Sequence, residues 1–272
     1  MSEQRDKNLW IFNAGNSFAG NPKWMFEYII RHHKEIKPVW MCYNADTMNY
    51  VHKLGYEAEL YHSSKGKSVM AKAGVYVVEM CKEVFQPELS GITVLNLWHG
   101  VGCKSIERKV TDGFLQERIA KKYIQNNDIL RNNQLFLVTS EIMEKHFKEQ
   151  CGIDDDKVIR AGYPRCVVND DIQSYDHDIR KKKGLSANTK LAIYCPTYRD
   201  NNGANFMKSA LPDMKRLADV LHENNILLIL KMHPMVEKDT QYLAMKETYQ
   251  NHPNFYFWEN EDDVYEIFSD ID

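Results

Sequence analysis

Hydrophobic residues gather in short runs along the chain, separated by longer and more polar stretches. Several runs are apolar at consecutive positions and rich in β-branched or aromatic residues, as is typical of buried parallel strands. They predict strands at 9–13, 38–43, 74–78, 92–98, 135–139, 158–161, 190–194, 226–231 and 255–258.

Helices are predicted between these runs. Residues 22–33 begin with a proline, which is favoured in the first turn of a helix. Apolar residues spaced three and four apart predict further helices at 111–131, 140–150, 211–224 and 239–250. Ser140 is expected to be an N-cap. The alternation of strands and helices predicts an α/β fold with parallel sheets covered by helices on both faces.

A polar stretch at 169–188 separates two such sets of strands and helices. We therefore expect a domain boundary near residue 168, with one domain at 1–168 and a smaller one at 169–272. The second domain contains only three predicted strands.

Composition narrows the function classes. The 272 residues are 43% hydrophobic and 27% charged, with a net charge of −3, so nothing global indicates nucleic-acid binding. No apolar run reaches the roughly 18 residues that span a bilayer, and the first residues lack a secretory signal. We expect a cytoplasmic protein or one bound to the inner face of a membrane. The six cysteines form no CxxC pair, so we expect reduced thiols and neither a metal nor a cofactor.

Two predicted strands end in histidine. Ligands of open parallel sheets bind outside the carboxyl ends of the strands. His99 follows the strand at 92–98 and is flanked by Gly100 and Gly102, which let backbone and substrate approach closely. An imidazole titrates near neutral pH and can accept a proton from a hydroxyl nucleophile. A histidine packed at a turn is the alternative.

The second histidine, His233, follows the strand at 226–231 and precedes a proline. Lys231, two residues earlier, is a candidate phosphate ligand. An incidental histidine at a strand end is the alternative here. One such end in each domain strengthens both assignments, because two facing domains would bring them into one cleft.

Two arginines also follow predicted strands. Arg199 suits a phosphate through paired hydrogen bonds, and Thr197 can donate another. A local ion pair between Arg199 and Asp200 is the alternative. Arg165, in a Gly-Tyr-Pro-Arg segment, also suits an anion, although that segment would serve equally well as an interdomain turn.

Weaker candidates lie on the first domain. The loop with Gly15 and Asn16 precedes a helix, whose first amides can hold an anion. It has neither a GxGxxG nor a GKS/T pattern, which disfavours dinucleotide-binding and P-loop folds. Lys104 is a candidate phosphate ligand or a solvated charge. The helix at 111–131 mixes basic and apolar residues, as expected for contact with anionic lipid or for ordinary surface packing.

Four motifs, in this order and spacing, resemble the CDP-glycerol glycerophosphotransferases that build teichoic acids and capsule polymers. They are NLWHGVGCK at 96–104, AGYPR at 161–165, YCPTYRD at 194–200 and LKMHP at 230–234. NPKWMFEYI at 21–29 and EDDVYEIFSDID at 261–272 add to the likeness, which covers essentially the whole chain.

The resemblance implies a GT-B-like fold with two Rossmann-type lobes facing a cleft, an acceptor-side lobe at 1–168 and a nucleotide-donor lobe at 169–272. It implies a CDP-linked polyol phosphate donor, a membrane-bound glycolipid or polymer acceptor, and a peripheral position on the inner membrane face. His99 would be the base, with Gly100, Gly102, Lys104, Gly15 and Asn16 on the acceptor side. His233 would contact the transferred phosphoryl group or protonate the leaving side. Arg199, Thr197, Arg165 and Lys231 would contact the donor phosphates.

The chain departs from the family pattern in two places. Val101 and Gly102 stand where the family usually has Thr-Pro. The family's Thr-Asp-Tyr-Ser-Ser loop, expected after the last segment, is absent, so we expect an incomplete second lobe and weak or no activity. Two alternatives are a GT-B glycosyltransferase that uses a nucleotide sugar and a non-catalytic binding subunit. The sequence does not choose between glycerol and ribitol, or between priming and polymerising.

Overall fold

The computed structural model describes residues 5–80, 86–102, 105–126, 129–167, 178–196, 209–233, 236, 239–259 and 263–272. The chain divides into two compact units, Met1–Ile172 and Gln173–Asp272, here called unit 1 and unit 2. The boundary predicted at residue 168 and the division itself both fall in 168–177, outside the described residues.

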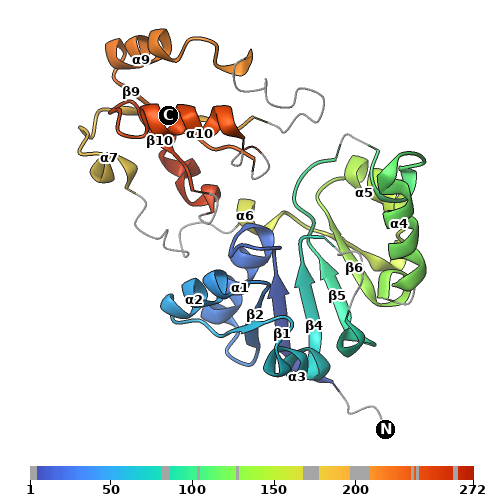
Figure 1. The fold of residues 1–272 in the computed structure, drawn as a ribbon. Helices are drawn as coiled ribbons and strands as arrows, with labels where there is room; N and C mark the ends of the chain where they lie inside the picture. The colour runs from blue at the N-terminus through green and yellow to red at the C-terminus, as the bar shows by residue number, and fades with distance from the viewer. Residues whose placement is uncertain are drawn as a thin grey trace. The chain divides into compact units, whose positions relative to one another are not determined.

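Unit 1 is built on a seven-stranded parallel sheet in the order β3-β2-β1-β4-β5-β6-β7 (Figure 1). Its strands are β1 (Asp6–Asn13), β2 (Lys37–Cys42), β3 (Ala58–Leu60), β4 (Ala73–Val78), β5 (Thr93–Asn96), β6 (Gln134–Val138) and β7 (Val158–Arg160). Because every pairing is parallel, all carboxyl ends lie along one edge of the sheet.

Helices cover both faces of this sheet. They are α1 (Gly20–His32), α2 (Ala45–Lys53), α3 (Ser64–Lys72), α4 (Phe114–Gln125), α5 (Glu141–Cys151) and α6 (Pro164–Val167), with short helical turns η1 (Pro87–Leu89), η2 (Glu107–Lys109), η3 (Ile129–Asn133) and η4 (Asp155–Lys157). Neighbouring residues of β1 enter different cores, since strand side chains alternate. Phe12 lies in the same core as Phe26 of α1 and Phe147 of α5, whereas Ile11 lies in the core that contains Met70 of α3.

Unit 2 contains a three-stranded parallel sheet in the order β10-β9-β8. Its elements are α7 (Ile179–Lys182), β8 (Lys190–Tyr194), α9 (Met214–Glu223), β9 (Ile226–Leu230), α10 (Thr240–Tyr249), β10 (Phe255–Phe257) and η6 (Val264–Asp270). One core lies between the sheet and α9 and α10, and it includes Leu221, Leu230 and Tyr242. A second core includes Leu227 and Ile267.

Most predicted elements are confirmed, with ends shifted by a few residues. The strand predicted at 92–98 ends at Asn96, and the helix predicted at 111–131 is wrong in length, because α4 covers only Phe114–Gln125. Ser140 caps α5 as predicted, since its hydroxyl accepts a hydrogen bond from the Met143 amide at 3.3 Å. The short strand β3 and the polar helices α2 and α3 were not predicted.

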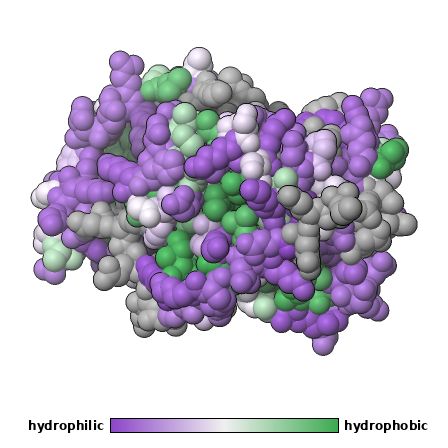
Figure 2. All heavy atoms as spheres, turned by 90° about the horizontal axis from the view of Figure 1, so that it is seen from below, coloured by the Kyte–Doolittle hydropathy of each residue, from purple (hydrophilic) through white to green (hydrophobic). Residues whose placement is uncertain are grey.

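Hydrophilic residues cover most of the face shown in Figure 2, with hydrophobic residues in smaller groups. Among the described helices, none is both long and apolar enough to cross a bilayer.

Candidate functional site

His99 lies just beyond β5, at the carboxyl edge of the sheet of unit 1. The preceding residue, Trp98, has a φ of +53°, a left-handed conformation that is unusual for a bulky side chain. Such a backbone costs about 1–2 kcal/mol, so the surroundings must hold it in place. The Asn96 side chain does part of this, because its Oδ1 accepts the Trp98 amide at 3.0 Å.

The turn at Trp98 places two aromatic rings face to face. The Trp98 indole is only 7% exposed and packs against Phe136 and Phe147 of the core. The imidazole of His99 stacks on this indole, with ring centroids 4.6 Å apart and an interplanar angle of 24°. His99 itself remains accessible to solvent. One face of the imidazole is thus fixed while part of the ring stays open to a substrate.

The first turn of α1 meets the ends of β4 and β5. Asn21 is completely buried, and its Nδ2 donates to the carbonyl oxygen of Trp98 at 2.7 Å. Its backbone amide donates to Oε1 of Glu79, which follows β4, at 2.9 Å. Gly20 has a φ of +70°, and a Cβ there would collide with the Glu79 carboxylate. Glu79 therefore serves as the anion at this helix N-terminus.

Arg165 approaches His99 from α6. Its Nη2 donates to the carbonyl oxygen of His99 at 2.7 Å, and its backbone amide donates to Oδ1 of Asn21 at 3.3 Å. The neighbouring Tyr163 hydroxyl donates to the carbonyl oxygen of Gly100 at 2.9 Å. The segment 161–165 is therefore more than an interdomain turn. It leads into α6 and donates hydrogen bonds to the carbonyl oxygens of His99 and Gly100.

The surroundings lower the pKa of the His99 imidazole. Desolvation by neighbouring protein atoms is the largest cause, and the positive charge of Arg165 acts in the same direction. A hydrogen bond between the ring and the backbone of Glu79 opposes them. The net effect favours the neutral imidazole, which is the form that accepts a proton.

Gly102 continues the loop and lies against α5. A Cβ at this position would sit 2.7 Å from Nε2 of His146, so glycine allows the imidazole to pack against the loop backbone. Nε2 of His146 is buried and has no hydrogen-bond partner among the residues that the structure describes. Lys104 lies outside the described residues.

The anion-binding loop predicted at Gly15 and Asn16 stays a prediction, and the contacts of these two residues are local. These residues lie at the end of β1, where Asn13 bonds to both the amide and the carbonyl of Gly15, and where Asn16 accepts from the Thr47 hydroxyl at 2.6 Å. The helix that follows already uses Glu79 as its anion. No contact recorded for the described residues joins Gly15 or Asn16 to His99.

In unit 2, the ends of β8 and β9 lie side by side, because Tyr194 pairs with Leu230. Lys231 therefore comes next to Cys195, and its charge opposes the burial that raises the pKa of that thiol. His233 is exposed just beyond β9. Thr197 and Arg199 lie outside the described residues. The structure thus brings Lys231 and His233 to the carboxyl edge of this second sheet.

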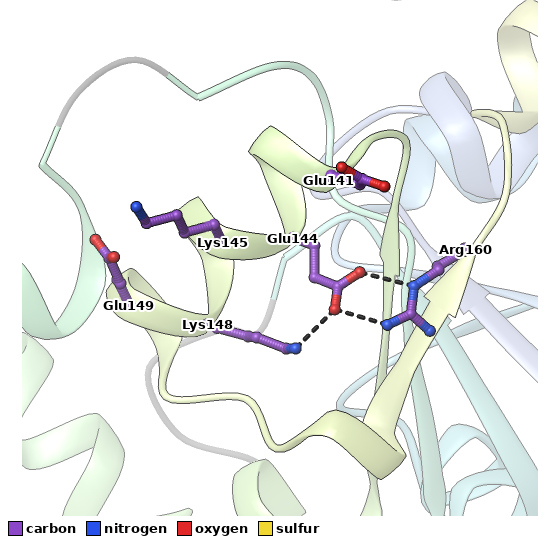
Figure 3. Close-up of a pocket in the computed structure, with 6 residues that line it drawn as sticks. All are labelled: Glu141, Glu144, Lys145, Lys148, Glu149 and Arg160. Carbon is purple, nitrogen blue, oxygen red and sulfur yellow. Dashed lines mark hydrogen bonds and ion pairs between the residues drawn. The ribbon is translucent and has the colours of Figure 1, made fainter.

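A charged hollow of about 460 Å³ lies between α5 and β7 (Figure 3). In it, the Glu144 carboxylate points toward Arg160 and Lys148. Nε and Nη2 of Arg160 each donate to a Glu144 carboxylate oxygen at 2.7 Å, and the Lys148 ammonium donates to Oε1 at 2.6 Å. This carboxylate is satisfied, and no predicted site residue lines the hollow. Among the described residues, no cluster of His, Cys, Asp or Glu could hold a metal ion.

Asn21, Glu79 and Tyr163 support His99 but were not among the predicted site residues. Asn21 and Tyr163 stood in motifs recognised from the sequence, which was the available signal. No sequence signal indicated Glu79, because its role depends on β1 and β4 being neighbours in the sheet.

Comparison with known proteins now adds to this geometry. A family model described as CDP-glycerol:poly(glycerophosphate) glycerophosphotransferase matches residues 1–272. The chain belongs to this family. The resemblance read from the four motifs is thereby confirmed.

The matching relatives are named as teichoic acid enzymes. A teichoic acid poly(glycerol phosphate) polymerase of Bacillus subtilis is 24% identical over 242 residues, covering 83% of this chain and 31% of the polymerase. One of Bacillus spizizenii is 22% identical over 262 residues, covering 89% and 64%. A ribitol-phosphate polymerase of Staphylococcus aureus, TarL, is 29% identical over 151 residues, covering 53% and 25%.

Solved structures agree on the fold. The wall teichoic acid polymerase TagF superposes with a TM-score of 0.76 at 19% identity, covering all of this chain and 66% of TagF. The GT-B-like α/β class is therefore confirmed. The chain spans about one third to two thirds of the length of the curated polymerases it matches first.

Proposed function

We propose that this protein transfers glycerol phosphate, or a similar polyol phosphate, from a CDP-linked donor to a hydroxyl group of a membrane-bound glycolipid or growing polymer. Family membership supports the donor class. The observation that carries the chemistry is His99, an accessible imidazole with a lowered pKa at the carboxyl edge of the sheet.

In the proposed reaction, the acceptor oxygen attacks the β-phosphorus of the donor in line with the bond to the bridging oxygen. Neutral His99 takes the proton of the attacking hydroxyl. The bond between the β-phosphorus and the bridging oxygen breaks, and CMP leaves with its electron pair. Because the phosphoryl group is already electrophilic, positioning and charge stabilisation carry most of the rate in such transfers.

The donor phosphates need cationic and hydrogen-bonding partners. Lys231 and His233 share the carboxyl edge of the unit 2 sheet and are proposed for this role, with Thr197 and Arg199 from the loop after β8. Arg165 is proposed to stabilise phosphate charge near His99, since its guanidinium already lies beside the His99 backbone. The residues around Gly100 and Gly102 are proposed to receive the acceptor.

The relatives are named for teichoic acid synthesis with glycerol or ribitol phosphate, which supports a teichoic-acid-type acceptor for this chain. One solved TagF variant, in which asparagine replaces a histidine, was soaked with CDPG. We propose a lipid-linked teichoic-acid-type acceptor and a peripheral position on the inner face of the cell membrane.

The test is release of CMP from CDP-glycerol and CDP-ribitol by the full chain, with a lipid-linked glycerol phosphate acceptor. His233→Ala should lower the rate on the order of 100-fold or more if it stabilises the transferred group. His222→Ala, on the outside of α9, is the matched control and should keep the wild-type rate. In thermal-shift titrations CDP should stabilise the protein more than UDP or GDP. Preference for UDP, or a fully active His233→Ala variant, would contradict the proposal.

A further inference from the structure

Asn21 joins three segments that are far apart in the sequence. Its side-chain amide holds the carbonyl of Trp98 at 2.7 Å, its side-chain oxygen accepts the amide of Arg165 at 3.3 Å, and its backbone amide holds the Glu79 carboxylate at 2.9 Å. The Asn21 residue is fully buried, and its bond to the Trp98 carbonyl is shielded from water.

Each of the three partners also acts directly on His99. Trp98 carries the indole on which the imidazole stacks. Arg165 donates to the His99 carbonyl oxygen at 2.7 Å. The backbone of Glu79 hydrogen-bonds to the imidazole itself. Asn21 therefore fixes the ring's stacking surface, its neighbouring cation and its hydrogen-bond partner relative to one another.

The backbone of Trp98 explains why such a crosslink is needed. A left-handed φ of +53° is disfavoured for a residue with a Cβ, so the turn would relax without outside support. Asn96 holds its amide and Asn21 holds its carbonyl, one on each side of the strained residue.

From this arrangement we infer that Asn21 is a positioning residue for the transfer reaction, which fixes the His99 imidazole against Trp98 and beside Arg165. The expected loss of kcat rests on the proposed function. The expected change in how His99 stacks on Trp98 can be observed without any reaction. Asn21 touches neither donor nor acceptor in this account and acts only through His99.

A double-mutant cycle separates this role from a general effect on folding. Asn21→Ala should lower kcat for CMP release on the order of 10- to 100-fold, as expected when a reacting group is misplaced. In a His99→Ala background the same substitution should change the residual rate less than about twofold, because the group it positions is gone. Equal losses in both backgrounds would overturn the inference.

Asn254→Ala is the matched control. Asn254 is also buried, and its Nδ2 donates to the carbonyl oxygen of Ile226 at 2.8 Å, at the start of β10 and away from His233. Asn254→Ala loses this buried hydrogen bond and should keep the kcat of the folded protein. If both variants lose kcat equally, Asn21 has only a structural role.

Histidine side-chain NMR supplies a readout that needs no substrate. The imidazole signals of His99, identified by their loss in His99→Ala, should carry the ring-current shift of the stacked indole. That shift should shrink in Asn21→Ala and persist in Asn254→Ala. If Asn21→Ala does not fold, Asn21→Ser removes the same bond to Trp98 with a polar side chain and is measured in its place. If the wild type releases no CMP, the proposed function fails, and the NMR result alone decides for or against Asn21.

Discussion

Because Trp98 has a left-handed backbone, a glycine variant at this position should be more stable than an alanine variant. At ordinary positions the order is the opposite. At a residue with negative φ, alanine is more stable than glycine by about 0.5–1 kcal/mol, because glycine loses more freedom on folding. At positive φ the Cβ is disfavoured by about 1–2 kcal/mol, which reverses the order. Trp98→Gly should therefore be more stable than Trp98→Ala by about 0.5–1 kcal/mol, even though both lose about 3–5 kcal/mol relative to the buried indole.

Leu97 is the matched control, since it is 1% exposed, adjacent in the chain and absent from the positive-φ residues. There, Leu97→Ala should be more stable than Leu97→Gly. The difference between the two positions should be about 1–2 kcal/mol. Urea unfolding followed by circular dichroism measures the free energy of unfolding of each variant. All samples contain sucrose, which keeps the destabilised variants folded. The fit allows each unit its own unfolding transition. The same order at both positions would refute the strained turn.

Three further predictions follow from single contacts. Gly102→Ala should lose about 1 kcal/mol of stability, because its Cβ would press on His146, and combining it with His146→Ala should restore part of the loss. Arg165→Met should raise the pKa of His99, since it removes a charge that lowers it, so the acidic limb of the kcat/KM profile should move to higher pH. Arg5→Met should cost about 2 kcal/mol in urea unfolding, because the guanidinium bonds to five backbone carbonyls.

The two arginine predictions each have a control in the same unit. Arg160→Met removes an arginine that pairs with Glu144 and should leave the pH profile in place. Lys7→Met removes an exposed charge next to Arg5 and should cost little stability. An unmoved acidic limb in Arg165→Met, or a Gly102→Ala variant as stable as wild type, would contradict the contacts described.

The sequence predicted strands well where they are buried on both faces, and less well where the pattern is weak. β3 was missed because it has only three residues and contains Glu59. α2 and α3 were missed because each has only nine residues and buries only one or two of them. The helix predicted at 111–131 was too long, because its continuing pattern includes the separate turn η3.

The site was predictable only as far as it depends on single strands. His99 and His233 were proposed as site residues because each comes shortly after a strong apolar run. The supporting residues depend on which strands are neighbours: Glu79 reaches Asn21 because β4 lies beside β1, and Arg165 arrives from beyond β7. Sequence spacing does not contain that order, which is why the contact between Glu79 and the start of α1 was not predicted.

The most direct test of the account is the rate of CMP release from CDP-glycerol by wild type and by His99→Ala, at saturating donor and acceptor. Loss of a general base should lower kcat about 10²- to 10⁴-fold, with donor binding retained in a CDP thermal shift. A His99→Ala variant that releases CMP at near the wild-type rate would contradict the central assignment.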